Sequence, residues 1–509
     1  ENARRLAFLS GSPFVKVEAT KAIRAGIAVF ALALIAFVAF KNWIPGGASR
    51  RASVLLSDDL VRRGPTAPSL KVLIPASALY APAILANGGT GLHEEGLFNK
   101  HHGVSVDLHI EEDANACLEL LSSGKADLVW MSTDSLARAY PLIRSINPVA
   151  ILLAGYSRGG DLVVARSLPA SPRDYRTKRI ACAAYTPHHF MMLYLLSLAG
   201  VRPDEVKWRL TRTPADAARL FARGKADICA AGRRDMGALP GRGAGTRVLL
   251  STEDAPGIFT GLLVARESTV ALQKEHLAGF VKGWFEGLDS MTGDMGPAEE
   301  LIAREFKTDA ADARSELENC SFAGYAENRA FFSIDDAEWD GFANLFDKAC
   351  ALYHGEYSEG APLSGFARNT DLLVSLEKEL RAYRSPGKQR PLAPSAGGEP
   401  LPGTITLRFP LNGIVPDFES RGELARFARD AHAFSGCAIA LYGREDPAED
   451  RWRNLAPQRA REAARILVSR HRIPPARIVL PGERPTEALP GDGDARGVDA
   501  RLVAPRRGL

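Results

Sequence analysis

The clearest chemical signal in this chain is a loop between an apolar run and a helix-forming stretch, at Thr186, Pro187, His188 and His189. The run before it, Ile180–Ala184, is short enough for a buried strand. Thr186 suits the N-cap of a helix, and Pro187 suits its first position. A helix that begins here points free N–H groups at the loop and attracts anions, and the two imidazoles add donors. The simpler interpretation is an ordinary strand–helix unit with two surface histidines.

Other reactive residue types are not grouped for catalysis. The sequence contains no nucleophile–histidine–acid grouping, no P-loop and no metal-ligand spacing. Its six cysteines are scattered without a CxxC pair, at Cys117, Cys182, Cys229, Cys320, Cys350 and Cys437. This argues against a zinc site and a disulfide framework, although one pair could be bridged in an oxidising compartment. We therefore expect a binding protein rather than an enzyme, with no cofactor and no metal.

The distribution of charge along the chain bears on the class of partner that it binds. The 509 residues carry a formal net charge of +4, and the basic residues are interleaved with acidic ones. Nothing in this pattern favours a nucleic-acid partner.

An apolar segment near the N-terminus predicts a membrane helix. Ala25–Phe40 is sixteen residues long and carries no charge. Extended to Ile44 it reaches the roughly 20 residues that a spanning helix needs, with Lys41 snorkelling and Trp43 at the interface. A cleavable signal peptide is the alternative, but its apolar region would be shorter.

Changes in composition along the sequence predict five segments. Residues 1–45 hold the N-terminal segment and the membrane helix, 46–69 form a linker, 70–384 a large α/β region, 385–403 a Pro/Gly linker, and 404–509 a βαβαββ-like module. In the large region strands alternate with helices, which predicts a mostly parallel sheet covered on both faces. Leu120–Met131 and Phe221–Ala231 echo one another, which favours two lobes built alike.

The large region resembles the type 2 periplasmic solute-binding proteins, within their taurine/nitrate/thiamine-precursor branch. The fragments that carry this resemblance include Gly124-Lys125-Ala126-Asp127, Ser132-Thr133-Asp134, Gly159-Gly160-Asp161, Ala184–His189 and Gly224-Lys225-Ala226-Asp227. It implies two lobes that are hinged by crossover strands and close on a small, often anionic solute. The family's pocket positions fall on Ser77, Tyr80, Ser132, Thr133, Asp134, Ser157, Arg158, Thr186, His188 and the Gly232–Asp235 turn.

Among these positions, Arg158 is the residue we expect to pair with an anionic group, because a guanidinium forms bidentate hydrogen bonds. The alternative is an arginine of the pocket rim in a surface salt bridge. Asp127 and Asp227 are expected to brace their turns rather than to touch a ligand.

The C-terminal module resembles the OmpA-like peptidoglycan-associated domain, on Gly443-Arg444-Glu445-Asp446 and on Asn454–Ala460. Asp446 and Arg459 match the family positions that bind the diaminopimelate of the peptide stem, an acid for its ammonium and a guanidinium for its carboxylate. The family's His and Thr are replaced in the loop, so a structural or partner-binding module is the alternative.

Together these resemblances imply a fused solute-binding/OmpA-family protein of the bacterial envelope. We expect a single-pass inner-membrane anchor, the bulk of the chain in the periplasm, and a small solute, peptidoglycan and membrane proteins as partners. One alternative is a scaffold that has lost its ligand and docks in a membrane complex. Another is an enzyme like the thiamine-pyrimidine synthase of the same branch, but that enzyme's cysteine-rich motif is missing from this sequence.

Overall fold

The computed structural model describes residues 69–505 apart from 170, 238–245, 336–338, 356–362, 387–397, 445, 447, 450–453 and 482–495. The predicted membrane span Ala25–Phe40 lies outside these residues, as does most of the linker 385–403. Of the helices that are described, none combines the length and the apolar character that a bilayer crossing requires. All described residues belong to one compact unit, Pro65–Leu509.

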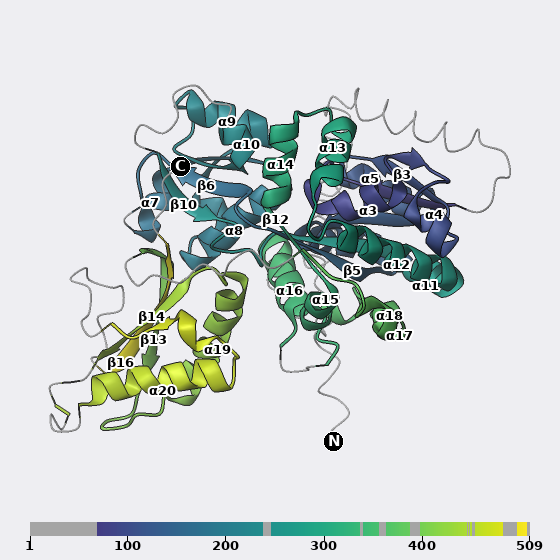
Figure 1. Cartoon of the computed structure of the whole chain (residues 1–509). Helices are drawn as coiled ribbons and strands as arrows, with labels where there is room; N and C mark the ends of the chain where they lie inside the picture. The colour runs from purple at the N-terminus through teal and green to yellow at the C-terminus, as the bar shows by residue number, and fades with distance from the viewer. Residues whose placement is uncertain are drawn as a thin grey trace, which may run out of the picture. The chain divides into compact units, whose positions relative to one another are not determined.

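Lobe 1 is built on a seven-stranded sheet in the order β12-β5-β11-β4-β1-β3-β2 (Figure 1). Its strands are β1 (Leu70–Ile74), β2 (Gly91–Leu92), β3 (Val106–Ile110), β4 (Leu128–Ser132), β5 (Pro148–Ser157), β11 (Thr260–Arg266) and β12 (Cys320–Phe322). Its first helices are η1 (Ala78–Tyr80), α3 (Ala81–Asn87), α4 (Leu97–His102), α5 (Ala114–Ser122), α6 (Thr133–Ile143) and η2 (Arg144–Ile146). Because α12 (Lys274–Ser290) packs against α3 and α4, chain segments far apart in sequence share this lobe.

The helices that follow lobe 2 in sequence return to lobe 1. They are α11 (Glu267–Leu272), α12 (Lys274–Ser290), α13 (Gly296–Glu305), α14 (Ala310–Glu318), α15 (Tyr325–Phe331), α16 (Gly341–His354), η4 (Leu363–Gly365), α17 (Asp371–Ser375) and α18 (Glu377–Leu380). α16 packs along α6, and α14 packs against α13 and η1.

Lobe 2 has a five-stranded sheet in the order β10-β6-β9-β7-β8. The strands are β6 (Asp161–Ala165), β7 (Arg179–Ala183), β8 (Lys207–Thr211), β9 (Ile228–Gly232) and β10 (Arg247–Ser251), and the helices are α7 (Pro172–Thr177), α8 (Pro187–Leu198), η3 (Pro203–Glu205), α9 (Pro214–Ala222) and α10 (Arg233–Gly237). The predicted strand–loop–helix around Thr186 is confirmed as β7 and α8.

The expectation of a mostly parallel sheet is wrong, because both sheets are mixed. β1 pairs in parallel with β3 and β4, and β7 with β8 and β9. β5, β6, β10 and β11 pair antiparallel with their neighbours. Two connections, β5 to β6 and β10 to β11, carry the chain directly from one sheet to the other. They have no crossover helix to return the chain in the parallel direction.

The internal echo reflects the same turn in each lobe. Asp127 accepts a hydrogen bond from the backbone N of Lys71 at 3.0 Å, and Asp227 accepts one from the backbone N of Arg179 at 2.9 Å. Each carboxylate therefore ties the start of one strand to the first strand of its parallel pair. Both aspartates brace the fold, as the sequence predicts.

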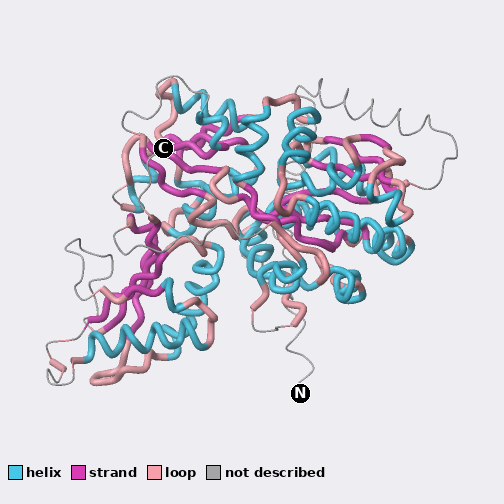
Figure 2. The backbone as a smooth tube through the Cα atoms, viewed as in Figure 1, coloured by secondary structure: helices cyan, strands magenta, loops and turns pink. Residues whose placement is uncertain are grey.

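The C-terminal module has a four-stranded sheet in the order β13-β16-β14-β15. Its elements are β13 (Glu399–Arg408), α19 (Phe418–Ala433), β14 (Ala438–Arg444), α20 (Leu455–Ser469), η6 (Pro475–Arg477), β15 (Ile478–Val479) and β16 (Gly497–Ala504), so the predicted βαβαββ order is confirmed. β13 starts at Glu399, several residues before the predicted end of the linker. Figure 2 shows the alternation of helix and strand within the module.

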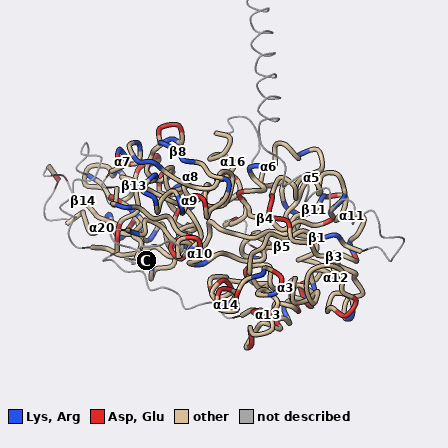
Figure 3. The backbone as a smooth tube through the Cα atoms, turned by 90° about the horizontal axis from the view of Figure 1, so that it is seen from above, with Lys and Arg blue, Asp and Glu red and all other residues tan. Residues whose placement is uncertain are grey.

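The largest apolar cluster runs through both lobes and the C-terminal module, and two smaller clusters lie in lobe 2 and in the module. One core cluster includes Leu73 of lobe 1, Phe190 of lobe 2 and Phe434 of the module. All six cysteines are free, and every one but Cys320 is buried, as expected of small apolar core residues. Figure 3 shows Lys and Arg interspersed with Asp and Glu along the described backbone, in keeping with the mild net charge.

Candidate functional site

The two connections between the lobes meet at Thr252. Its hydroxyl oxygen accepts hydrogen bonds from the backbone N of Gly159 at 2.8 Å and of Asp161 at 3.2 Å, and lies 3.2 Å from the Ser157 hydroxyl. Ser157 in turn donates to Asp161 Oδ2 at 2.5 Å. The predicted site residue Ser157 therefore sits in a hinge network that joins the β5–β6 and β10–β11 connections.

His188 extends this network to the first turn of α8. Its Nε2 lies 2.8 Å from Asp161 Oδ1, and its ring meets the edge of Phe259 at 5.4 Å between centroids. The side chain is 11% exposed, so the interpretation of a surface histidine is wrong. The buried Nδ1 atom has no hydrogen-bond partner among the described residues. The structure thus joins two predicted residues, Ser157 and His188, through Asp161.

Three predicted residues at the start of α6 lie in lobe 1. Asp134 is 1% exposed, and its Oδ2 accepts a hydrogen bond from the Tyr353 hydroxyl at 3.2 Å. Burial raises the pKa of the Asp134 carboxyl. Thr133 Oγ1 lies 2.5 Å from Thr260 Oγ1, and Ser132 donates to Ser135 at 2.9 Å. These side chains face partners within the protein.

The remaining predicted residues have mostly local contacts. Ser77 caps η1, with its hydroxyl 3.4 Å from the backbone N of Leu79. Tyr80 is buried beside Trp130 at 5.2 Å between ring centroids, and this burial raises the pKa of its phenol. Thr186 donates to the carbonyl of Ala183 at 2.8 Å rather than capping α8.

Arg158 lies between Ser157 and the two glycines of the β5–β6 connection, and its backbone N donates to the carbonyl of Asn319 at 2.7 Å. The predicted Gly232–Asp235 turn faces the same region. Its Arg234 pairs with Glu316 at 2.9 Å and with Asp312 at 3.4 Å. These ion pairs join α10 of lobe 2 to α14 of lobe 1.

Two carboxyl groups near the hinge have pKa values shifted from their ordinary range. Burial raises the pKa of Asp235, which the charge of His188 opposes. Burial likewise raises the pKa of Glu316, and its hydrogen bond to Arg234 opposes the shift.

Two helix N-termini open toward this region without side-chain caps. Neither Ser132 at the start of α6 nor Thr186 at the start of α8 bonds its side chain to the first turn of its helix. By contrast, Thr213 caps α9 through the backbone N of Asp216. Uncapped N–H groups at a helix start favour an anion. Of these two starts, α6 belongs to lobe 1 and α8 to lobe 2.

The sequence did not single out Asp161 as a ligand residue, and it missed Thr252 and Tyr353 altogether. Asp161 stood in the Gly159-Gly160-Asp161 fragment, which was a usable signal. Thr252 lies 91 positions from Asp161 and Tyr353 lies 219 positions from Asp134, so local patterns gave no sign of either contact. Within the part of the chain that is described, no group of His, Cys, Asp and Glu side chains is arranged to hold a metal ion.

Replacing Thr252 with valine is expected to destabilise the protein by about 1–2 kcal/mol, because the buried N–H group of Gly159 and the partly buried N–H group of Asp161 lose their acceptor. Thr292→Val is the matched control, since the Thr292 hydroxyl is buried without a partner among the described residues. Urea unfolding of both variants measures the difference. Equal stability of the two variants would contradict the role of Thr252 in the hinge.

The side chains of the two residues predicted to bind peptidoglycan, Asp446 and Arg459, hydrogen-bond to different partners. Asp446 accepts from the backbone N of Ala448 at 2.9 Å. Arg459 is 0% exposed and donates to both carboxylate oxygens of Glu449 and to the carbonyl of Gly413. Glu449 thus occupies the guanidinium edge that the resemblance assigns to a ligand carboxylate. The binding roles of Asp446 and Arg459 stay predictions.

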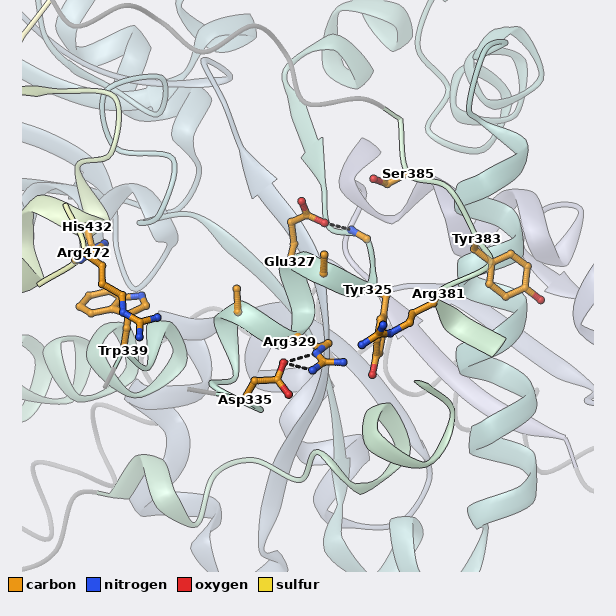
Figure 4. Close-up of a pocket in the computed structure, with 13 residues that line it drawn as sticks. Tyr325, Glu327, Arg329, Asp335, Trp339, Arg381, Tyr383, Ser385, His432 and Arg472 are labelled. Carbon is orange, nitrogen blue, oxygen red and sulfur yellow. Dashed lines mark hydrogen bonds and ion pairs between the residues drawn. The ribbon is translucent and has the colours of Figure 1, made fainter. Parts of the chain in front are cut away.

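A groove of about 850 Å³ lies away from the predicted site (Figure 4). Tyr325, Arg329 and Arg381 line one part of it, and Trp339 and His432 another. Arg329 is already paired with Asp335 and Glu377. Arg381 pairs with Glu377 as well, so both guanidinium groups on this side of the groove are already paired within the protein.

Sequence comparison supplies independent information about the two lobes. A sequence model of the family described as "ABC transporter, phosphonate, periplasmic substrate-binding protein" matches residues 97–281. The match covers less than half of the chain, running from α4 of lobe 1 through lobe 2 into α12. Over these residues it agrees with the predicted resemblance to periplasmic solute-binding proteins. No curated protein matches the chain.

Several solved structures are similar at low identity. The periplasmic aliphatic sulphonate binding protein SsuA of Escherichia coli is 16% identical, with 57% of this chain and 92% of that chain covered and a TM-score of 0.44. A putative sulfonate-binding SsuA of Methylobacillus flagellatus is 15% identical, covering 63% and 99%, with a TM-score of 0.46. The nitrate-binding protein NrtA of Synechocystis is 11% identical, covering 63% and 91%, with a TM-score of 0.46. Similarity at this level says nothing about the ligand of this chain.

Proposed function

We propose that residues 70–384 bind a small anionic solute at the boundary of the two lobes, as the substrate-binding part of an ABC-type importer. The observation that carries this proposal is the family match over residues 97–281, which takes in parts of both lobes. The match does not extend to the C-terminal module. The proposal is one of binding, with no chemical step.

The geometry of the hinge region supports an anion rather than a neutral solute. The uncapped starts of α6 and α8 each present backbone N–H groups, one set from each lobe. Arg158 lies in the β5–β6 connection, one of the two that join the lobes. A solute held by both lobes would favour their closure, because its contacts differ between the open and closed states.

A thermal-shift screen tests this function with sulfonates, phosphonates, nitrate and carboxylates as probes. A probe at about 100 times its dissociation constant adds roughly 2.7 kcal/mol of stability. For any probe that binds, Arg158→Ala is expected to weaken binding by about 1.5–3 kcal/mol. Arg202→Ala is the control, because Arg202 is exposed and pairs only with its neighbour Asp204 in the ion pairs described. Equal affinity of both variants would remove Arg158 from the site.

A ligand-free scaffold is the second candidate function. Ser157, Asp161 and His188 already hydrogen-bond one another, and Asp134 pairs with Tyr353. Polar groups that pair with one another within the protein favour a docking body over a receptor, whereas His188 Nδ1 and Asp134 Oδ1 have no hydrogen-bond partner among the described residues. Silence across the whole probe library would support the scaffold.

The envelope setting is part of the proposal. The N-terminal span would anchor the chain in the inner membrane, and the C-terminal module would reach peptidoglycan or an envelope partner. Binding of a stem-peptide carboxylate by Arg459 would require displacement of Glu449. Pull-down with isolated sacculi tests the wall contact, and equal recovery of the wild type and Asp446→Ala would remove Asp446 from it.

A further inference from the structure

The C-terminal module touches the β10–β11 connection backbone to backbone. The backbone N of Gly436 donates to the carbonyl of Asp254 at 2.9 Å. A Cβ built on Gly436 would lie 1.9 Å from the carbonyl oxygen of Glu253, and one on Gly257 would lie 3.1 Å from Ala433. Contacts this close leave no room for the connection to slide past the module.

The module also meets both lobes at one carboxylate. Asp430 of α19 accepts a hydrogen bond from the Tyr194 hydroxyl of α8 at 2.9 Å and lies 3.4 Å from Lys348 Nζ of α16. The same Lys348 ammonium donates to Ser197 of α8 at 3.1 Å. α8 belongs to lobe 2, whereas α16 packs on α6 of lobe 1. Nearby, Trp339 stacks on His432 at 3.6 Å between centroids.

The burial of α8 agrees with this arrangement. Every residue from His188 to Leu196 is buried, so the helix has no solvent-facing side along this stretch. A helix that is apolar all round needs cover on all faces. β7 and β9 cover it from lobe 2, and α16 and β13 provide further cover.

A single turn connects the module contact with the hinge network. Residues 251–254 form it, with Asp254 Oδ2 accepting from the backbone N of Ser251 at 2.9 Å. Asp254 meets the module, and Thr252 two residues earlier holds the β5–β6 connection. The route from Gly436 to His188 therefore runs through Asp254, Thr252 and Asp161 in direct contacts.

We propose that the C-terminal module is an intramolecular clamp on the hinge, and that its docking holds the two lobes in the arrangement in which Arg234 of α10 pairs with α14. Rotation of one lobe against the other moves the β10–β11 connection and separates α8 from α16. Either movement strains the contacts of Gly436 or Asp430. Because coupling between two equilibria is reciprocal, whatever stabilises this arrangement of the lobes also favours docking of the module. This inference goes beyond solute binding, and its test needs no solute.

The test is hydrogen exchange of the full-length Gly436→Ala variant, followed by mass spectrometry. The added methyl group clashes only with residues 253 and 254 among its nearest neighbours, so it wedges the module from the hinge while sparing the module's own core. Gly422→Ala on α19 is the matched control, because no atom lies within 4 Å of its Cβ. The reporters are α10 and α14, which the Arg234 ion pairs join across the lobes.

We expect exchange in α10 and α14 to become about 5-fold faster or more in Gly436→Ala, the lower end of typical coupling between sites, and to stay at the wild-type rate in Gly422→Ala. Faster exchange confined to residues 253–257 and 430–437 would overturn the clamp. If Gly436→Ala does not fold, Asp430→Asn replaces it, since the amide keeps the shape but loses the charge that attracts Lys348. Unchanged exchange in α10 and α14 of a folded Asp430→Asn would overturn the proposal equally.

Discussion

Replacing Glu449 with alanine is expected to destabilise the C-terminal module by about 3–5 kcal/mol, the cost of leaving a buried charge without its partner. The Glu449 side chain is 2% exposed and that of Arg459 is 0% exposed. Hydrogen bonds from Arg459 lower the pKa of Glu449 to about 2. The pair therefore stabilises the module above about pH 4.5, and its contribution is lost as the pH falls toward 2.

Hydrogen exchange of β14 and β16 in increasing urea measures this loss within the full chain. Glu462→Ala is the matched control, because Glu462 pairs with Arg465, which is 62% exposed. Exposed pairs of this kind contribute about 0–1 kcal/mol. If both glutamate variants lower the free energy of unfolding by the same amount, the buried pair of Glu449 and Arg459 contributes no more than the exposed pair.

A double variant shows whether the lost stability comes from the unpaired charge or from the lost side-chain packing. Glu449→Leu combined with Arg459→Met replaces both charges with apolar groups of similar volume. Such replacements are often neutral or stabilising, so most of the lost stability should return. The carbonyls of Gly413 and Arg444 would then lose a donor, which sets the limit of the recovery.

Much of the fold follows from local pattern. The alternation of apolar runs with helical stretches predicts β7 and α8, α9 and β9, and the order of the C-terminal module, because each of these elements is specified within its own segment. The strand direction in the centre of each sheet does not follow from local pattern. β5 pairs with β11 over a separation of about a hundred residues, so no window of the sequence contains both partners.

The candidate site likewise has residues that the sequence predicts and contacts that it does not. Ser157 and His188 could be named, because they follow strand ends where open α/β sheets bind ligands. Their shared partner Asp161 and the Thr252 hydroxyl could not be assigned, because the contact depends on how two lobe connections cross. The two adjacent histidines were misjudged for another reason. Their exposure depends on what covers α8, and that cover comes from α16 and β13, far along the chain.

The burial of His189 has a consequence for pH. The residue is 8% exposed, and its ring meets the edges of Trp208 at 5.1 Å and Tyr353 at 6.1 Å. Its Nδ1 lies 3.3 Å from the backbone N of Tyr185 and accepts that hydrogen bond. Burial lowers the pKa of His189 to about 4, and the nearby charge of Arg138 adds to the shift.

The unfolded chain therefore binds a proton at His189 below about pH 6.5 that the folded chain binds only below about pH 4. Stability from this residue is present above pH 6.5 and is lost as the pH falls toward 4, by about 3 kcal/mol in total and about 2 kcal/mol by pH 5. Comparison of the free energies of unfolding of the wild type and His189→Asn at pH 7 and pH 5 isolates this contribution, because the other titrating groups are common to both proteins. We expect the difference between the two proteins to shrink by about 2 kcal/mol between these pH values. A constant difference would mean that the pKa of His189 is the same in the folded and the unfolded protein. Water would then have to reach its ring between α8 and α16.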